Sequence, residues 1–208
     1  MATLAFSSLF TALGLWQVQR AQQARQHDAI LQQRVNAGYL SITQLATLRQ
    51  PDDFPVQASG YFDNTHSLLL DNRILDDHVG YEVLTPFKTD SGYTLLVNRG
   101  WLPRGASRSI LPYITPIEGW VTLRGISHQP DHNIFLPTSV SNPHPMWPQR
   151  VAEIDLAQIS AQLGLPLLPV VVRLDPDVQF PATPSLPRSW QQPVRFTPKR
   201  TPAASGDC

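Results

Sequence analysis

The stretch that decides the fold is residues 80–103, which read GYEVLTPFKTDSGYTLLVNRGWLP. Two runs rich in β-branched, aromatic and leucine side chains, Tyr81–Lys88 and Tyr93–Asn98, flank the polar sequence Thr89-Asp90-Ser91-Gly92. Such side chains favour extended strands, and a short polar segment that ends in glycine favours a tight turn. The stretch therefore predicts an antiparallel β-hairpin.

Similar short runs, bounded by Gly, Pro, Asn and Asp, lie on both sides of this hairpin and predict further strands. They are Phe54–Phe62, Ser67–Asp71, Ile117–Gly125 and Leu168–Leu174. In the last run Val170, Val171 and Val172 leave little room for a polar face, so we expect this strand to be buried on both sides.

The N-terminal segment contains no charged side chain over its first 19 residues. At about 1.5 Å per residue, a helix of this length would just cross a hydrocarbon core of roughly 30 Å. Trp16, Gln17 and Arg20 would form the aromatic and cationic boundary of such a helix at the membrane interface. We therefore expect a transmembrane anchor over residues 1–19.

Two features of this segment leave alternatives open. A secretory signal peptide is the competing interpretation, although a basic region at its start is missing. Arg20 and Arg25 both follow the segment, so the positive-inside bias would keep the domain in the cytoplasm. Basic residues ahead of Met1, from a start codon further upstream, would remove this bias and allow the domain to lie on the other side of the membrane.

The rest of the chain divides into three predicted parts. Residues 20–50, rich in Gln, Ala and Arg at their start, are expected to form a helical stalk and a short helix. Residues 51–175 are expected to form a β-rich soluble domain. Residues 176–208 are a proline-rich tail that we expect to be extended and largely unpacked, with contacts at most from Trp190 and Val194.

Capping signals place two short helices beside the strands. Ser41 and Gln44 resemble a capping box before an amphipathic helix that ends ahead of Pro51. Asp155 can cap a helix over Leu156–Leu163, which stops at Gly164. The predicted fold class is α+β and mostly antiparallel β, a curled or barrel-like sheet with flanking helices and an N-terminal transmembrane helix.

The composition argues against several classes of function. Lys and Arg total 16 and Asp and Glu also total 16, which gives no electrostatic reason to expect nucleic acid. The single cysteine, Cys208, cannot form an intrachain disulfide, and the six histidines match no zinc motif. No Gly-x-Ser-x-Gly elbow and no phosphate-binding glycine loop occur, so we expect no catalytic residues, no metal ligands and no enzyme activity.

Four segments together resemble the surfeit locus protein 1 family, in its order and roughly its spacing. They are Leu13–Arg20; Gly60-Tyr61-Phe62 followed by Asp71-Asn72-Arg73; Gly80–Phe87 leading to Leu96–Pro103; and Asn142-Pro143 with Trp147 and Asp155 downstream. The third segment is the most specific, and the resemblance extends from about Leu13 to Arg200.

The resemblance implies a membrane-anchored factor that assembles cytochrome c oxidase, assisting haem a insertion into subunit I or stabilising that subunit. Haem a would be a transferred ligand, and the partners would be subunit I, other oxidase assembly factors and the membrane. The domain would lie on the periplasmic side of the inner membrane, or at the mitochondrial inner membrane in a eukaryote. A general ligand-binding or scaffolding module, or an inactive truncated copy, are the alternatives.

The chain departs from the family pattern after Arg200. There the resemblance implies a haem-associated histidine and a second transmembrane helix, whereas this chain continues as Thr201–Cys208. We interpret this as a truncation or frameshift near Arg200, or as a divergent member, and expect no haem-ligating histidine here.

The candidate site residues are those that match the family motifs, and they are expected to contact a partner or haem. They are Trp16, Gln17, Arg20, Gly60, Arg73, Gly80, Tyr81, Asn98, Arg99, Gly100 and Trp101. An internal role is the alternative for the arginines. Arg99 could pair with Glu82 across the hairpin while Trp101 fills the edge of the core, and Arg73 could hold a haem propionate or pair internally.

Overall fold

The structure is a computed structural model that describes residues 13–20, 22, 34, 36–105, 110–130, 146–188 and 190. The chain divides into two compact units, residues 1–36 with 191–208, and residues 37–190. In the first unit residues 13–20 are helical, whereas most of the predicted anchor and stalk lies outside the described residues. Within the described residues no helix is both long enough and apolar enough to cross a bilayer.

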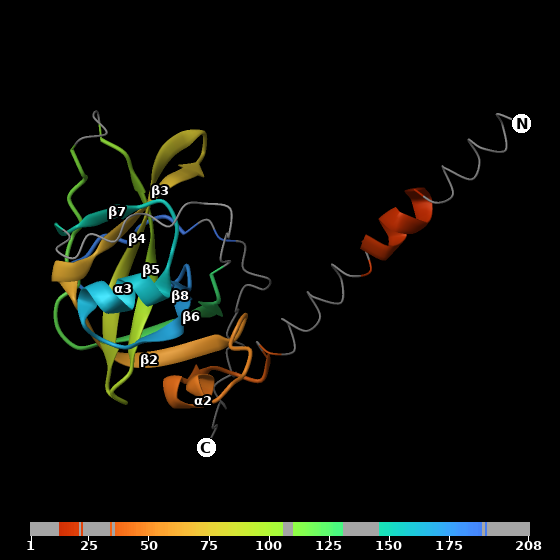
Figure 1. Cartoon of the computed structure of the whole chain (residues 1–208), viewed down its shortest axis with the longest axis horizontal. Coiled ribbons are helices and arrows are strands. Elements are labelled where there is room, and N and C mark those ends of the chain that lie inside the picture. Colours follow the sequence, from red (N-terminus) through yellow and green to blue (C-terminus); the bar gives the residue numbers. More distant parts are fainter. Residues whose placement is uncertain are drawn as a thin grey trace, which may run out of the picture. The chain divides into compact units, whose positions relative to one another are not determined.

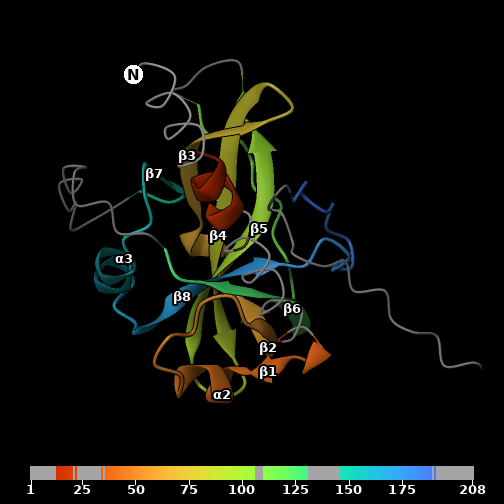
Figure 2. The ribbon, with the colours of Figure 1, turned by 90° about the vertical axis from the view of Figure 1, so that its right-hand side faces the viewer.

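The second unit is built on one continuous sheet of eight strands in its described part (Figures 1 and 2). The strands are β1 (Leu40–Ser41), β2 (Pro55–Phe62), β3 (Leu68–Leu75), β4 (His78–Thr89), β5 (Thr94–Pro103), β6 (Val121–His128), β7 (Gln149–Val151) and β8 (Leu167–Leu174). Their order in the sheet is β1-β2-β6-β8-β5-β4-β3-β7, with a further pairing between β2 and β4. That pairing closes β2, β6, β8, β5 and β4 into a five-stranded barrel, which confirms the predicted barrel-like sheet.

One pair of neighbours in the barrel is parallel. β8 runs parallel to β5 and antiparallel to β6, whereas the other barrel neighbours are antiparallel. A ring with an odd number of strands needs such a pair, since strand direction cannot alternate all the way round. The predicted strand Leu168–Leu174 is confirmed, and Val170, Val171 and Val172 are all buried within it.

The core occupies both faces of the barrel wall because successive side chains of a strand point to opposite sides. Leu95 and Val97 on β5 belong to the main cluster with Phe62 and Phe87. Leu96, on the other face of β5, packs with Val171 and with Ile159 of α3 (Leu156–Leu163). Figure 1 shows α3 lying against this outer face of the sheet.

The helix caps form as their sequence predicts. Ser41 and Gln44 make a complete capping box at the start of α2 (Ile42–Ala46). The carboxylate of Asp155 accepts a hydrogen bond from the Gln158 amide at the start of α3. Gly164 ends that helix with a φ of 64°, a left-handed conformation that glycine adopts without a steric penalty.

The strand predicted over Ile117–Gly125 begins later, at Val121. The backbone amide and carbonyl of Ile117 both bond to the side chain of Asn64, which follows β2 in the short 3₁₀ helix η1 (Asn64–His66). These groups are therefore not available to a strand ladder, and Gly119, with a φ of 77°, turns the chain before β6.

The prediction of a largely unpacked tail is wrong for residues 176–188. Val178 and Phe180 are buried in the main core cluster. The guanidinium of Arg188 donates to the backbone carbonyls of Arg99, Asp175 and Val178. Trp190 does contact the domain, as predicted, through an indole N–H that donates to the Leu174 carbonyl, whereas Val194 lies outside the described residues. Proline-rich sequence here forms an ordered strap because an arginine and apolar side chains anchor it.

Candidate functional site

The polar side chains of three adjacent strands gather on the outer face of the barrel. Leu84, Leu96 and Val171 pack under α3 on that face. Glu82, Asn98 and Arg173 lie two positions from these three residues along β4, β5 and β8. Because side chains of a strand alternate between its two faces, they point to the same side as the apolar residues. The row of outward-facing residues thus changes from apolar to polar where α3 no longer covers it.

These polar residues line a pocket of about 250 Å³. We call it the polar pocket; its lining also includes Arg73, His128, Pro130, Ala152, Glu153, Ile154 and Val171. Both carboxylate oxygens of Glu82 are engaged, one by Asn98 Nδ2 at 2.6 Å and the other by Arg73 Nε at 3.6 Å. Arg73 therefore pairs internally, the alternative that its sequence left open.

Arg173 lies beside that pair and is half-buried. Burial lowers the pKa of its guanidinium, which the nearby Glu82 carboxylate partly counteracts. Its side chain makes no hydrogen bond or ion pair with any other described residue. Arg173 and His128 were not among the predicted site residues. The signal that could have identified Arg173 is a cation inside the otherwise apolar strand LLPVVVRL, residues 167–174.

Arg99 is placed by a β-bulge. Val83 opposes Gly100 and Leu84 opposes Asn98, so Arg99 has no partner residue on β4. Gly100 adopts a φ of 130°, and a Cβ there would lie 2.7 Å from both Leu186 Cβ and the Pro187 carbonyl oxygen. The extra residue turns the Arg99 side chain away from Glu82.

The Arg99 guanidinium is almost fully buried, with 3% of the residue exposed. One nitrogen, Nη2, donates to the Thr115 carbonyl, and the group lies 5.8 Å from the ring centre of Phe62. Nε and Nη1 have no hydrogen-bond partner in the described part of the chain. Burial, and then the charge of Arg188, lower the pKa of Arg99 to about 10. The proposed Arg99–Glu82 pair is therefore wrong.

Trp101, Gly80 and Tyr81 form a packed group on the hairpin. The indole Nε1 of Trp101 donates to the Arg73 carbonyl at 3.0 Å. A Cβ on Gly80 would lie 2.5 Å from carbons of that indole, so only glycine lets the ring lie flat on the strand. Tyr81 is fully buried, and its hydroxyl has no hydrogen-bond partner among the described residues. Trp101 thus lies half-buried over Gly80, with its indole bonded to the neighbouring strand β3.

The remaining candidate residues are Gly60 in the barrel and three residues of the first unit. Gly60 stands where β2 meets β4, and a Cβ there would be 2.0 Å from the Lys88 carbonyl oxygen, so its role is to let the barrel close. In the first unit the Arg20 guanidinium stacks 5.5 Å from the ring centre of Trp16, with Gln17 in the same helix.

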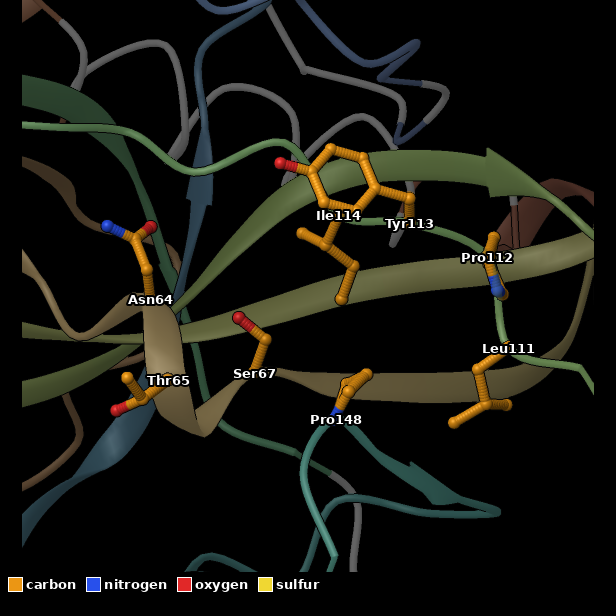
Figure 3. Close-up of a pocket in the computed structure, with 8 residues that line it drawn as sticks. All are labelled: Asn64, Thr65, Ser67, Leu111, Pro112, Tyr113, Ile114 and Pro148. Carbon is orange, nitrogen blue, oxygen red and sulfur yellow. The ribbon is translucent and has the colours of Figure 1, made fainter.

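A second, more apolar pocket of about 390 Å³ opens beside η1 (Figure 3). Leu111, Pro112, Tyr113 and Ile114 form one side of it, with Asn64, Thr65, Ser67 and Pro148 opposite. Tyr113 is 80% exposed. We call this the apolar pocket; none of the family-motif residues lines it.

Neither pocket has the side chains of a metal centre. In the described part of the chain no three His, Cys, Asp or Glu residues converge on one point. His128, the histidine of the polar pocket, has its Nδ1 3.4 Å from Asp52 Oδ1. What the polar pocket offers a ligand is guanidinium donors beside apolar surface.

Comparison with known proteins identifies the family. A model of the SURF1 family matches residues 4–200. Surfeit locus protein 1 of Homo sapiens is 34% identical over 131 residues, which cover 55% of this chain and 44% of that protein. The Mus musculus protein of the same name is 34% identical over 108 residues, 44% of this chain and 35% of that protein.

A third relative, the SURF1-like protein of Monosiga brevicollis, is 29% identical over 138 residues, 60% of this chain and 53% of that protein. The chain therefore spans about half the length, or less, of these curated relatives. The family match, however, includes the whole barrel and the hairpin that carries Arg99 and Trp101. By that match, the chain belongs to the SURF1 family.

Proposed function

We propose that this protein is an assembly factor for cytochrome c oxidase that stabilises subunit I or assists haem a insertion into it. The observation that carries the proposal is the family match over residues 4–200. The most specific of the family motifs forms the central hairpin of the barrel, β4 and β5. Because the role follows from the family, it is tested best in a cell that needs the oxidase.

The proposed mode of action is binding and positioning rather than bond-making chemistry. The barrel presents guanidinium donors in one pocket and apolar surface in another. Haem a combines acidic side groups with a large apolar ring, and each pocket is suited to one of these features. Each pocket is also small for a whole macrocycle, so we propose transient contact with part of such a ligand.

The proposed location is the periplasmic side of the cell inner membrane, or the mitochondrial inner membrane in a eukaryote. Residues 1–19 would anchor the chain, with Trp16 and Arg20 at the interface. Their stacking pair is of the kind that stabilises such a boundary. The partners would then be oxidase subunit I and the other assembly factors in the same membrane.

Deleting the gene from an organism that relies on this oxidase tests the proposal. We expect the a-type band in the reduced-minus-oxidised spectrum of the membranes to fall and to return when the gene is restored. Restoring it with Arg99→Met tests the bulge residue, and Arg104→Met, at an exposed arginine beyond β5, is the matched control. An unchanged a-type band in the deletion strain would overturn the proposal.

The apolar pocket favours a second candidate, a ligand-binding or scaffolding module that docks other membrane proteins. Its exposed Tyr113 and its proline-lined wall are typical of a surface that receives an apolar segment. Copurification separates the two functions. Oxidase subunit I as the main partner supports assembly, whereas a set of unrelated membrane proteins supports scaffolding.

A further inference from the structure

We propose that the polar pocket binds the carboxylate of a small or short-chain organic ligand, with Arg173 as the main donor and Arg73 as the second. This inference does not rest on the oxidase-assembly proposal, because it follows from the charges and the shape of the pocket. Nothing in the family match assigns a ligand to this place.

Among the described residues, the charges around the pocket leave the guanidinium of Arg173 without a bonded anion. Glu82 is held by Asn98 and Arg73, as described above. Asp52 is held by His128 and by the Gln129 amide, which donates to its Oδ1 at 2.7 Å. The guanidinium of Arg173 is close enough for Glu82, Asp52 and Asp53 to raise its pKa, but it is bonded to none of them.

An unbonded guanidinium in a half-buried place is energetically unfavourable. Burial removes part of its water and lowers its pKa, and no group of the described residues replaces that water. The planar fork of an arginine fits a carboxylate with two parallel N–H···O bonds. An anion that enters the pocket would supply the missing partner, and Arg73 at the rim would add a second positive charge.

The lining suggests an organic acid rather than an inorganic anion. Ile154 and Pro130 provide a smaller apolar surface beside the arginines. The volume of about 250 Å³ is larger than one anion needs but below the typical range of about 300–1,000 Å³ for drug-sized ligands. A carboxylate with a short aliphatic chain satisfies both, whereas phosphate would leave the apolar surface bare.

Glu153 provides a second test of the inference, with an expected effect on binding opposite to that of Arg173. Its side chain also lines the pocket, but it forms no ion pair with Arg173 and is not among the charges that affect the pKa of that arginine. A bound carboxylate would be repelled by Glu153. Replacing Glu153 with glutamine should therefore strengthen binding, whereas replacing Arg173 should weaken it.

The test is a titration of the full-length chain with sodium hexanoate, followed by NMR of the arginine Nε–H groups. We expect saturable shifts of the Arg173 and Arg73 signals, and much smaller ones with hexanamide, which has the same chain but no charge. Arg173→Met should weaken hexanoate binding by at least about tenfold. Arg173→Lys, which keeps the charge but loses the fork, should also weaken it. Glu153→Gln should strengthen it a few-fold.

Arg104→Met is the matched control, because Arg104 is exposed and lies outside the pocket, and it should leave the affinity unchanged. The inference is overturned if hexanoate shows no saturable binding, if hexanamide binds equally well, or if both Arg173 variants bind like the wild type. Equal binding of inorganic phosphate would overturn the choice of a carboxylate. None of these outcomes bears on the oxidase spectrum of the deletion strain.

Discussion

Replacing Arg99 with methionine should lower the free energy of unfolding by no more than about 2 kcal/mol, although only 3% of the residue is exposed. The pKa of its guanidinium falls from 12.5 to about 10 on folding. At about 1.4 kcal/mol per unit, burying the charge destabilises the fold by roughly 3 kcal/mol at neutral pH. Methionine has a similar length and removes this penalty.

The interactions that methionine loses are of similar size. The hydrogen bond to the Thr115 carbonyl contributes about 1.5–3 kcal/mol and the stacking on Phe62 about 1–2 kcal/mol. The net change for Arg99→Met should therefore lie between a gain of about 0.5 kcal/mol and a loss of about 2 kcal/mol. Arg99→Ala also empties the space of the side-chain stem and should be less stable by about 2–4 kcal/mol.

Urea denaturation of the two variants and the wild type at pH 7 measures these differences. The sign of the pH dependence gives a second check. Because folding lowers the pKa of Arg99, its penalty is present below pH 10 and is relieved as the pH rises above that value. The wild type should therefore gain stability relative to Arg99→Met above pH 10. A loss of more than about 3 kcal/mol in Arg99→Met at pH 7 would refute the view of Arg99 as a poorly partnered buried charge.

Two further substitutions, with one control, test the packing and the electrostatics of the second unit. Gly80→Ala should lower the free energy of unfolding by at least about 3 kcal/mol, because its Cβ would lie 2.4 Å from the Leu102 carbonyl oxygen. In the same denaturation experiment Gly105→Ala, where no atom lies within 4 Å of the added Cβ, should change it by less than about 0.5 kcal/mol. Burial and the hydrogen bond to Asp175 raise the pKa of the Tyr39 hydroxyl above its usual value. The neutral phenol therefore stabilises the fold fully below about pH 10, and this stabilisation is lost as the pH rises further. Tyr39→Phe should show no such alkaline loss in thermal unfolding, and an equal loss in both proteins would contradict this assignment.

Local signals in the sequence predict the elements that depend on near neighbours. The hairpin around Gly92 and the helix between Asp155 and Gly164 form as predicted, because turn and cap chemistry acts over a few residues. The barrel follows in outline from the many short strands. Its closure between β2 and β4 depends on a close approach at Gly60, which no local pattern reveals.

The candidate site was predicted less well because its geometry depends on distant parts of the chain. The bulge that buries Arg99 is held by residues 186 and 187, in a tail whose proline content suggested no packing. Arg73 and Asn98 were found from the family motifs. Arg173 joins them only because β8 pairs with β5 in register, with Asn98 opposite Arg173.

The position of β8 also has a consequence for how the chain matures. It lies between β5 and β6, although it leaves the ribosome after all the other described strands. Until residue 174 emerges, the edges of β5 and β6 that β8 will later occupy have no pairing partner in the nascent chain. Molecular chaperones that recognise exposed strands would find their target in that interval, and slow translation before β8 would prolong it.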